Sequence, residues 1–107
     1  MIELARIENI PSGQTLKVEK DEYRLCLVNI EDDIYIIDDT CSHADFSLSE
    51  GLVDVEECEI ECPKHGALFD LKTGNPRSLP ATRPVKNYKA IVQDGIIYME
   101  EDRDVRN

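Results

Sequence analysis

The sequence predicts an all-β fold of antiparallel strands in one domain, and three observations lead to this prediction. Short apolar runs rich in β-branched residues recur along the chain, and clusters of turn-forming residues separate them. An Asp94-Gly95 pair lies between two such runs, as in a tight hairpin. No stretch shows the apolar periodicity of an amphipathic helix of several turns. A length of 107 residues fits a single compact domain, 1–107, with one core.

Four strands are expected in the first forty residues, arranged as an antiparallel meander. Apolar residues, many of them β-branched, dominate each run, and turn-forming residues end it. The expected strands are Ile2 to Ile7, Leu16 to Val18, Tyr23 to Ile30 and Ile34 to Ile37. The expected turns are Pro11 to Gly13, Lys20 to Glu22 and Glu31 to Asp33.

The middle third differs in pattern and is expected to form a small insert at about residues 40–75. Residues Glu56 to Cys62 alternate, with Cys58, Ile60 and Cys62 on one face and glutamates on the other, which predicts a half-buried strand. A second short strand is expected next, at Ala67 to Leu71. The flanking parts, about 1–39 and 76–101, are expected to form a basal sandwich that ends in a hairpin of Tyr88 to Gln93 and Ile96 to Glu100.

The charge of the chain excludes two classes of partner. Lysine and arginine together number 12, against 23 aspartates and glutamates, and the formal net charge is −11. Such a surface repels nucleic-acid phosphates and anionic lipid headgroups, so we expect no nucleic acid and no membrane partner. No apolar run is long enough to span a bilayer, and the N-terminal residues lack the pattern of a signal peptide. We expect a soluble, cytoplasmic protein whose partners carry basic patches, although an acidic surface can also simply maintain solubility.

Two short units contain the residues that could bind a metal. Cys41-Ser42-His43 and Cys62-Pro63-Lys64-His65 each pair a thiolate donor with an imidazole donor. The linker between them, positions 44–61, holds 18 residues. This length lets two loops meet face to face, so four soft or borderline ligands can converge on one metal centre.

These units, with Gly66-Ala67-x-Phe69-Asp70-x-x-Thr73-Gly74 after the second, resemble the Rieske iron–sulfur signature, most closely that of the ferredoxins of bacterial multicomponent oxygenases. The resemblance implies one [2Fe–2S] cluster of the Rieske type. Its cofactor-binding and metal-ligating residues would be Cys41, His43, Cys62 and His65. It also implies the Rieske fold, an antiparallel β-sandwich with a small cluster-binding subdomain.

Zinc is the competing metal, because two cysteines and two histidines also form a closed tetrahedral site. Each unit here mixes the two ligand types. That mixture favours the cluster, in which one iron takes both thiolates and the other takes both imidazoles. The colour of the protein would separate the two metals.

The two remaining cysteines are expected to be buried structural thiols rather than ligands. Cys26 shares a strand face with Val28, and Cys58 shares one with Ile60. On an extended strand Cys58 would lie roughly 13 Å from Cys62, beyond the span of one cluster. A disulfide between these two is not expected in a reducing compartment.

The resemblance implies a one-electron carrier that passes electrons from a flavin-containing reductase to a terminal oxygenase, such as a dioxygenase. The chain has two histidines and the motif uses both, so a mononuclear iron site of two histidines and a carboxylate cannot form beside the cluster. We therefore expect an electron-transfer protein and not an enzyme. The alternative is the non-catalytic small subunit of a nitrite-reductase-type complex, although members of that group commonly lack the ligands.

The resemblance also guides expectations about the surroundings of the cluster. The extra cysteine pair of the respiratory relatives is absent, and Ala67 stands where those relatives place a hydrogen-bonding serine. With fewer donors to the sulfides, we expect a reduction potential at the lower end of the Rieske range. Leu79-Pro80-Ala81 resembles the third loop that shields the cluster, and otherwise is a proline-rich connector. Phe46 and Phe69 are expected in the core.

Overall fold

The computed structural model describes residues 1–41, 46–64, 66–78 and 83–100. The expected ligands His43 and His65, and the expected loop residues 79–81, lie outside the described residues. The described strands form three antiparallel sheets. The terminal sheet has the order β1 (Ile2–Arg6), β10 (Ile96–Met99), β9 (Ala90–Gln93); the central sheet β2 (Thr15–Lys20), β3 (Tyr23–Ile30), β4 (Asp33–Asp38), β8 (Asn87–Tyr88); and the small sheet β5 (Leu52–Asp54), β6 (Glu59–Glu61), β7 (Leu68–Asp70).

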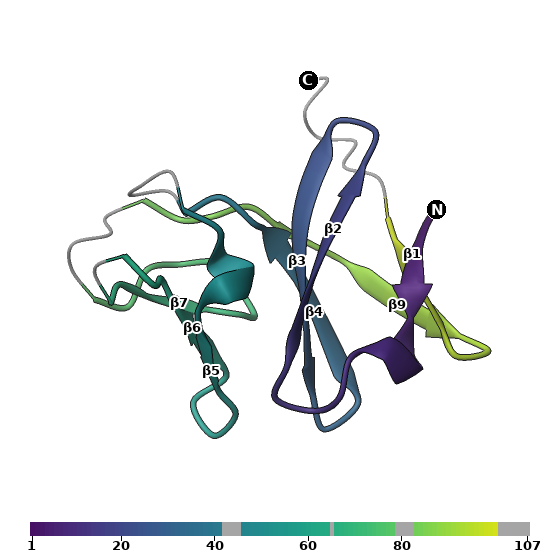
Figure 1. The fold of residues 1–107 in the computed structure, drawn as a ribbon, viewed down its shortest axis with the longest axis horizontal. Helices are drawn as coiled ribbons and strands as arrows, with labels where there is room; N and C mark the ends of the chain where they lie inside the picture. The colour runs from purple at the N-terminus through teal and green to yellow at the C-terminus, as the bar shows by residue number, and fades with distance from the viewer. Residues whose placement is uncertain (42–45, 65, 79–82, 101–107) are drawn as a thin grey trace.

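The central sheet packs on both of its faces, and two cores result. Figure 1 shows it between the small sheet on the left and the terminal sheet on the right. Leu25 and Leu27 of β3 join the core shared with the terminal sheet. Cys26 and Val28, which alternate with them, join the core shared with the small sheet. Because side chains of a strand alternate between faces, β3 is buried on both sides, and it is apolar at nearly every position from Leu25 to Ile30.

The prediction of an all-β antiparallel fold is confirmed, since the helical segments among the described residues are two short 3-10 turns, Ile7–Asn9 and Leu48–Glu50. No helix in the described ranges is long and apolar enough to cross a membrane. The expected hairpin is also confirmed. Its turn residues Asp94 and Gly95 have φ values of 55° and 76°, both in the left-handed region that a tight primed turn requires.

Three expectations about the strands were wrong. β1 does not join the meander of β2, β3 and β4 but pairs with β10. The expected strand from Tyr88 to Gln93 is broken at Lys89, where the chain passes from the central sheet to the terminal sheet. The expected strand from Glu56 to Cys62 shortens to Glu59–Glu61 because Cys58 lies in a turn with a φ of 55°. The short partner strand β5 was not expected at all.

Candidate metal centre

The two cysteines of the predicted ligand set are both buried, and each begins a loop. Cys41 follows β4 and Cys62 directly follows β6, and their exposed fractions are 3% and 0%. Both thiols belong to the core between the central and small sheets. An apolar surrounding of this kind keeps water away from a metal–thiolate bond.

The two loops close in the same way. The Cys41 amide donates a hydrogen bond to the carbonyl of Phe46 at 2.9 Å, and the Cys62 amide donates one to the carbonyl of Ala67 at 2.7 Å. Gly66, at a φ of 76°, also donates from its amide to the carbonyl of Cys62, at 3.0 Å. Each closed loop thus begins with a cysteine and spans the position of one predicted histidine ligand.

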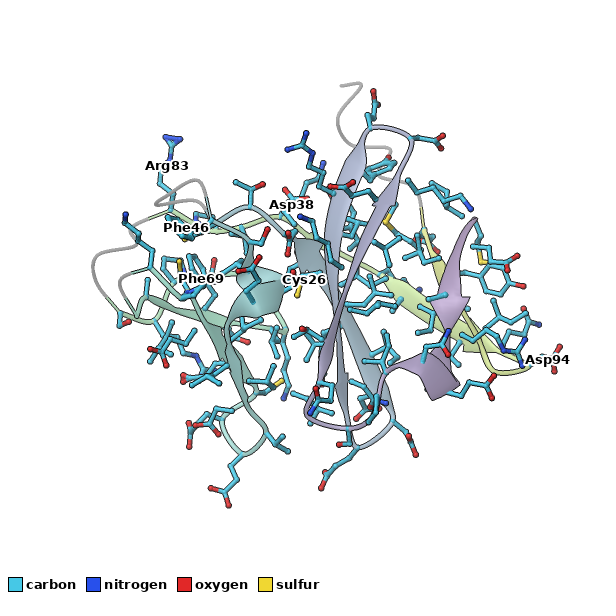
Figure 2. All side chains as sticks on the ribbon, viewed as in Figure 1. Cys26, Asp38, Phe46, Phe69, Arg83 and Asp94 are labelled. Carbon is cyan, nitrogen blue, oxygen red and sulfur yellow. The ribbon has the colours of Figure 1, made fainter. Side chains whose placement is uncertain are left out.

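One side-chain contact joins the two loops. The Lys64 Nζ lies 4.9 Å from the centroid of the Phe46 ring, within the range of a cation–π interaction. Phe46 is 41% exposed, so its expected place in the core was wrong, whereas Phe69 is fully buried as expected. In Figure 2, Phe46 and Arg83 lie at the same end of the molecule, far from the hairpin residue Asp94. An aromatic side chain and at least two cations therefore lie at the loop end of a strongly acidic protein.

Two glycines allow close backbone contacts between the segments that flank the two loops. A Cβ atom at Gly51 would lie 1.7 Å from the carbonyl oxygen of Glu61, the residue before Cys62. A Cβ at Gly74, where φ is +82°, would lie 2.1 Å from the carbonyl oxygen of Val85. At both positions a side chain would collide with backbone, so these approaches require glycine.

The first loop is anchored by an aspartate that sequence reasoning missed. Asp39 is 2% exposed; its Oδ1 accepts the Ser49 amide at 2.8 Å and its carbonyl accepts the Leu48 amide at 2.6 Å. Lys17 on β2 lies 3.7 Å from Oδ2, so the buried carboxylate is compensated. The available signal was an aspartate directly after an apolar strand, where such side chains often accept backbone amides.

The two cysteines outside the motif, Cys26 and Cys58, differ in their surroundings. Cys26 is fully buried as expected, and burial, followed by the nearby Asp39 carboxylate, strongly raises the pKa of its thiol. Cys58 was expected to be buried but is only partly buried, because it packs against the same core from the turn before β6. Its carbonyl accepts the Leu71 amide at 3.0 Å. No disulfide joins any of the four cysteines in the structure.

The described donors fit the thiolate half of a mixed-ligand centre. Among the described residues, no three cysteine, histidine, aspartate or glutamate side chains gather as metal ligands. Both histidines of the chain, His43 and His65, lie outside the described residues, so the structure shows the two cysteines of the predicted ligand set and not its two histidines.

Known proteins similar to this chain agree on its family. Residues 1–89 match the Rieske [2Fe–2S] domain. The ferredoxin subunit of 3-phenylpropionate/cinnamic acid dioxygenase from Photorhabdus laumondii is 40% identical over 93 residues, which is 87% of each chain. The corresponding subunit from Escherichia coli strain K12 is 36% identical, over 88% of this chain and 87% of the relative.

Solved structures show the same likeness. The ferredoxin of carbazole 1,9a-dioxygenase from Nocardioides aromaticivorans IC177 superimposes with a TM-score of 0.90 at 32% identity, covering 94% of this chain and 97% of the other. A ferredoxin in a complex of reduced oxygenase and oxidised ferredoxin of carbazole 1,9a-dioxygenase has a TM-score of 0.85 at 32% identity, over 92% of this chain and all of that one. The chain therefore belongs to the Rieske [2Fe–2S] domain family, and one Rieske-type cluster is its cofactor.

Proposed function

We propose that this protein is a one-electron carrier that takes electrons from a flavin-containing reductase and passes them to the terminal oxygenase of a dioxygenase system. One observation carries the proposal: the chain is 40% identical to a dioxygenase ferredoxin subunit across 87% of both proteins. A solved complex of a similar ferredoxin with its oxygenase supports the second half of the route. The first step, electron transfer from a flavin-containing reductase, rests on the resemblance of the sequence to the ferredoxins of multicomponent oxygenases.

We further propose that Cys41, His43, Cys62 and His65 hold the cluster within a binding region at about residues 40–75. When bound, the cluster accepts and releases one electron. The chain's own residues exclude water from the cluster. The two thiols are buried, and they share one apolar core with the fully buried Ala67 and other apolar side chains. The matched closure of the two loops supports this ligand set.

Electron transfer without catalysis follows from the same ligand set. If both histidines bind the cluster, none remains for a mononuclear iron site, and substrate oxidation belongs to the partner. Cys26 and Cys58, which lie outside the proposed ligand set, are not joined in a disulfide, and unpaired thiols of this kind are typical of a reducing compartment such as the cytoplasm. A protein described as the small subunit of a nitrite reductase also shares the fold, with a TM-score of 0.81, but at 18% identity this likeness concerns the fold alone and does not favour the alternative function.

The proposal can be tested by counting and following electrons. Anaerobic titration of the purified holoprotein with dithionite should consume one electron per chain, with reversible bleaching of the visible absorbance. The reduced protein should then be reoxidised on mixing with the oxidised oxygenase component of a bacterial 3-phenylpropionate dioxygenase. A chain that accepts no electron, or that hydroxylates the aromatic substrate by itself, contradicts the proposal.

A further inference from the structure

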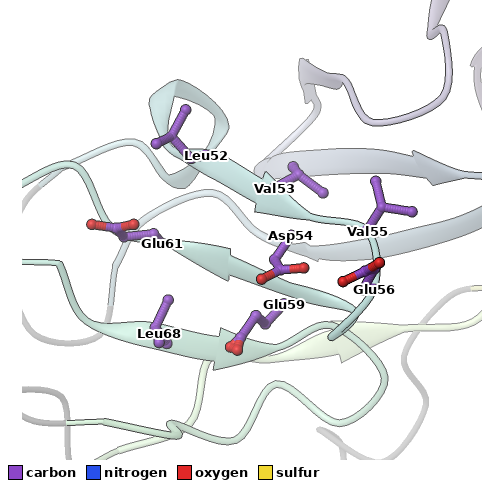
Figure 3. A pocket seen from close by; sticks show the side chains of 8 residues that line it. All are labelled: Leu52, Val53, Asp54, Val55, Glu56, Glu59, Glu61 and Leu68. Carbon is purple, nitrogen blue, oxygen red and sulfur yellow. The ribbon is translucent and has the colours of Figure 1, made fainter.

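A carboxylate is buried beside the first cysteine of the proposed ligand set. Asp39 lies two residues before Cys41 and is 2% exposed, and the other acidic side chain buried among the described residues is Glu59. Glu59 alternates with the core residue Ile60 and faces the outer side of the small sheet, where it lines a hollow with exposed carboxylates (Figure 3). Asp39 instead lies at the start of the first loop. Because burying a charge is costly in free energy, its place next to a proposed ligand indicates a role.

Contacts to the segment that follows the first loop hold this carboxylate in place. Its Oδ1 accepts the Ser49 amide at 2.8 Å, and its Oδ2 lies 3.7 Å from the Lys17 Nζ on β2. The same Nζ donates to the Ser47 hydroxyl at 3.3 Å. The Thr15 hydroxyl, also on β2, donates to the Ser49 carbonyl at 2.6 Å. The ion pair of Asp39 and Lys17 thus joins β2 to the end of β4 and to the segment after the first loop, and its charges have fixed positions.

The charge of Asp39 acts within the core that contains the two proposed thiolate ligands. Two residues of extended backbone span roughly 7 Å, so the backbone of Asp39 lies within that order of distance from Cys41. Cys26 belongs to the same core as Cys41 and Cys62. Burial raises the pKa of the Cys26 thiol, and the Asp39 carboxylate raises it further. A negative charge at Asp39 therefore disfavours a second negative charge in this core.

A fixed negative charge in this place opposes reduction of the cluster. Reduction adds one electron, and so one negative charge, to the bound cluster. Asp39 repels that charge, whereas Lys17 attracts it. The two effects differ in size, because the Asp39 side chain is 3% exposed and the Lys17 side chain is 44% exposed and also lies 3.8 Å from Glu19. Solvent and salt weaken the effect of Lys17 more than that of Asp39, so the pair as a whole favours the oxidised state.

We propose that Asp39 and Lys17 form an ion pair that sets the reduction potential of the cluster, with Asp39 lowering the potential and Lys17 partly offsetting it. In the transfer itself one electron passes from the reductase to the cluster, and the pair exchanges neither electrons nor protons. The inference rests on the proposed ligand set, because it requires Cys41 to bind iron. It adds a second cause of a low potential to the missing hydrogen-bond donor at Ala67.

Redox titration of the holoprotein tests the pair, with visible absorbance giving the ratio of reduced to oxidised protein at the wild-type midpoint potential. Asp39→Asn keeps an oxygen that can accept the Ser49 amide but removes the charge, so it should raise this ratio about tenfold, a shift of about 59 mV. The rise should persist at high salt, because Asp39 is buried. Lys17→Met should lower the ratio roughly threefold, and Lys17→Arg, which keeps the charge, should leave it unchanged.

Two control variants make the same charge changes at exposed residues. Glu56→Gln alters a residue on the outer side of the small sheet, and Lys20→Met alters the last residue of β2. Both should leave the ratio near that of the wild-type protein, because solvent screens charges at these positions.

The signs of the shifts separate this role from a structural one. A pair that only holds the loop would shift Asp39→Asn and Lys17→Met in the same direction. That result, shifts of equal size in the controls, or equal ratios in Lys17→Met and Lys17→Arg would each overturn the inference. If Asp39→Asn does not bind iron, the two Lys17 variants decide alone. A wild-type protein without a cluster would instead overturn the ligand set, which the other outcomes leave standing.

Discussion

The central sheet and the small sheet are held together in different ways. β2, β3 and β4 pair over six positions at each contact, and β3 is buried on both faces. The strands of the small sheet pair over three positions each. Around the small sheet there are close backbone contacts at glycines and side-chain hydrogen bonds, such as the one that Asp39 accepts from the Ser49 amide, in place of long runs of hydrogen bonds between strands. The central sheet, which belongs to the base of the molecule, is therefore stabilised by many equivalent backbone hydrogen bonds. The small sheet, at the end that carries the two loops, is stabilised by a few specific contacts.

The largest effect is expected from removing a proposed cluster ligand. Cys62→Ser should abolish cluster binding, because it deletes one of the two buried thiolates, whereas Cys58→Ser should leave iron and acid-labile sulfide near the wild-type content. Iron and sulfide analysis of the purified proteins measures both. Equal loss in the two variants would show that Cys58 belongs to the site.

The close approach of Gly51 to the Glu61 carbonyl should affect stability and cluster content almost as strongly. Gly51→Ala would force a Cβ to within 1.7 Å of the Glu61 carbonyl oxygen, so the chain around Cys62 must move. We expect a loss of about 3 kcal/mol in unfolding free energy and reduced iron content. Gly95→Ala is the matched control, because Gly95 has a φ of +76° with nothing within 4 Å, and should cost about 1 kcal/mol with full iron content. Chemical denaturation would detect this difference; similar losses at both positions would refute the comparison of the two regions.

The base could be predicted from the sequence because its signals are local. Alternating apolar residues define β3, and Asp94-Gly95 defines the last turn. The partner of β1 could not be predicted, because the pairing with β10 joins the two ends of the described chain. Glu59 of β6 is 6% exposed and its Oε1 lies 3.7 Å from Arg77, a contact across 18 positions of sequence that no local pattern indicates.

In the candidate site, too, the features with a local sequence signal could be predicted and those that depend on packing could not. The ligand motif was recognisable from its spacing, whereas the contact between Gly51 and Glu61 depends on how distant segments pack. Phe46 was expected in the core because it is apolar, yet it is exposed beneath Lys64. Hydrophobicity alone does not place a side chain that lies beside a functional loop.

Lys64 should raise the reduction potential, because its positive charge lies in the second loop and favours the reduced, more negative cluster. Lys64→Met is expected to lower the potential by on the order of tens of millivolts. Lys89→Met, at a 70% exposed side chain in the base, should change it little. Redox titrations at low and high salt would measure both variants, and a larger shift in Lys89→Met would contradict a local charge effect.

The smallest effect concerns Tyr35, which packs against the core next to Cys58. Burial, then a hydrogen bond with Cys58, raises the pKa of this phenol above its ordinary value. The neutral form therefore stabilises the fold fully below the unfolded pKa of about 10, and this contribution is lost as the pH rises through the higher folded value. Tyr35→Phe should cost about 1 kcal/mol at neutral pH, and the difference should shrink in alkali. Denaturation at a series of pH values measures it; a difference that grows in alkali would reverse the assigned sign.

The most direct test of the mixed-ligand cluster is electron paramagnetic resonance of the reduced protein, with its histidines labelled with ¹⁵N. The chain has two histidines, so the label reports on both predicted imidazole ligands and on nothing else. We predict a rhombic signal with a low average g value and hyperfine coupling to two histidine nitrogens. A reduced protein that is silent and colourless, or a signal without histidine coupling, would contradict the account.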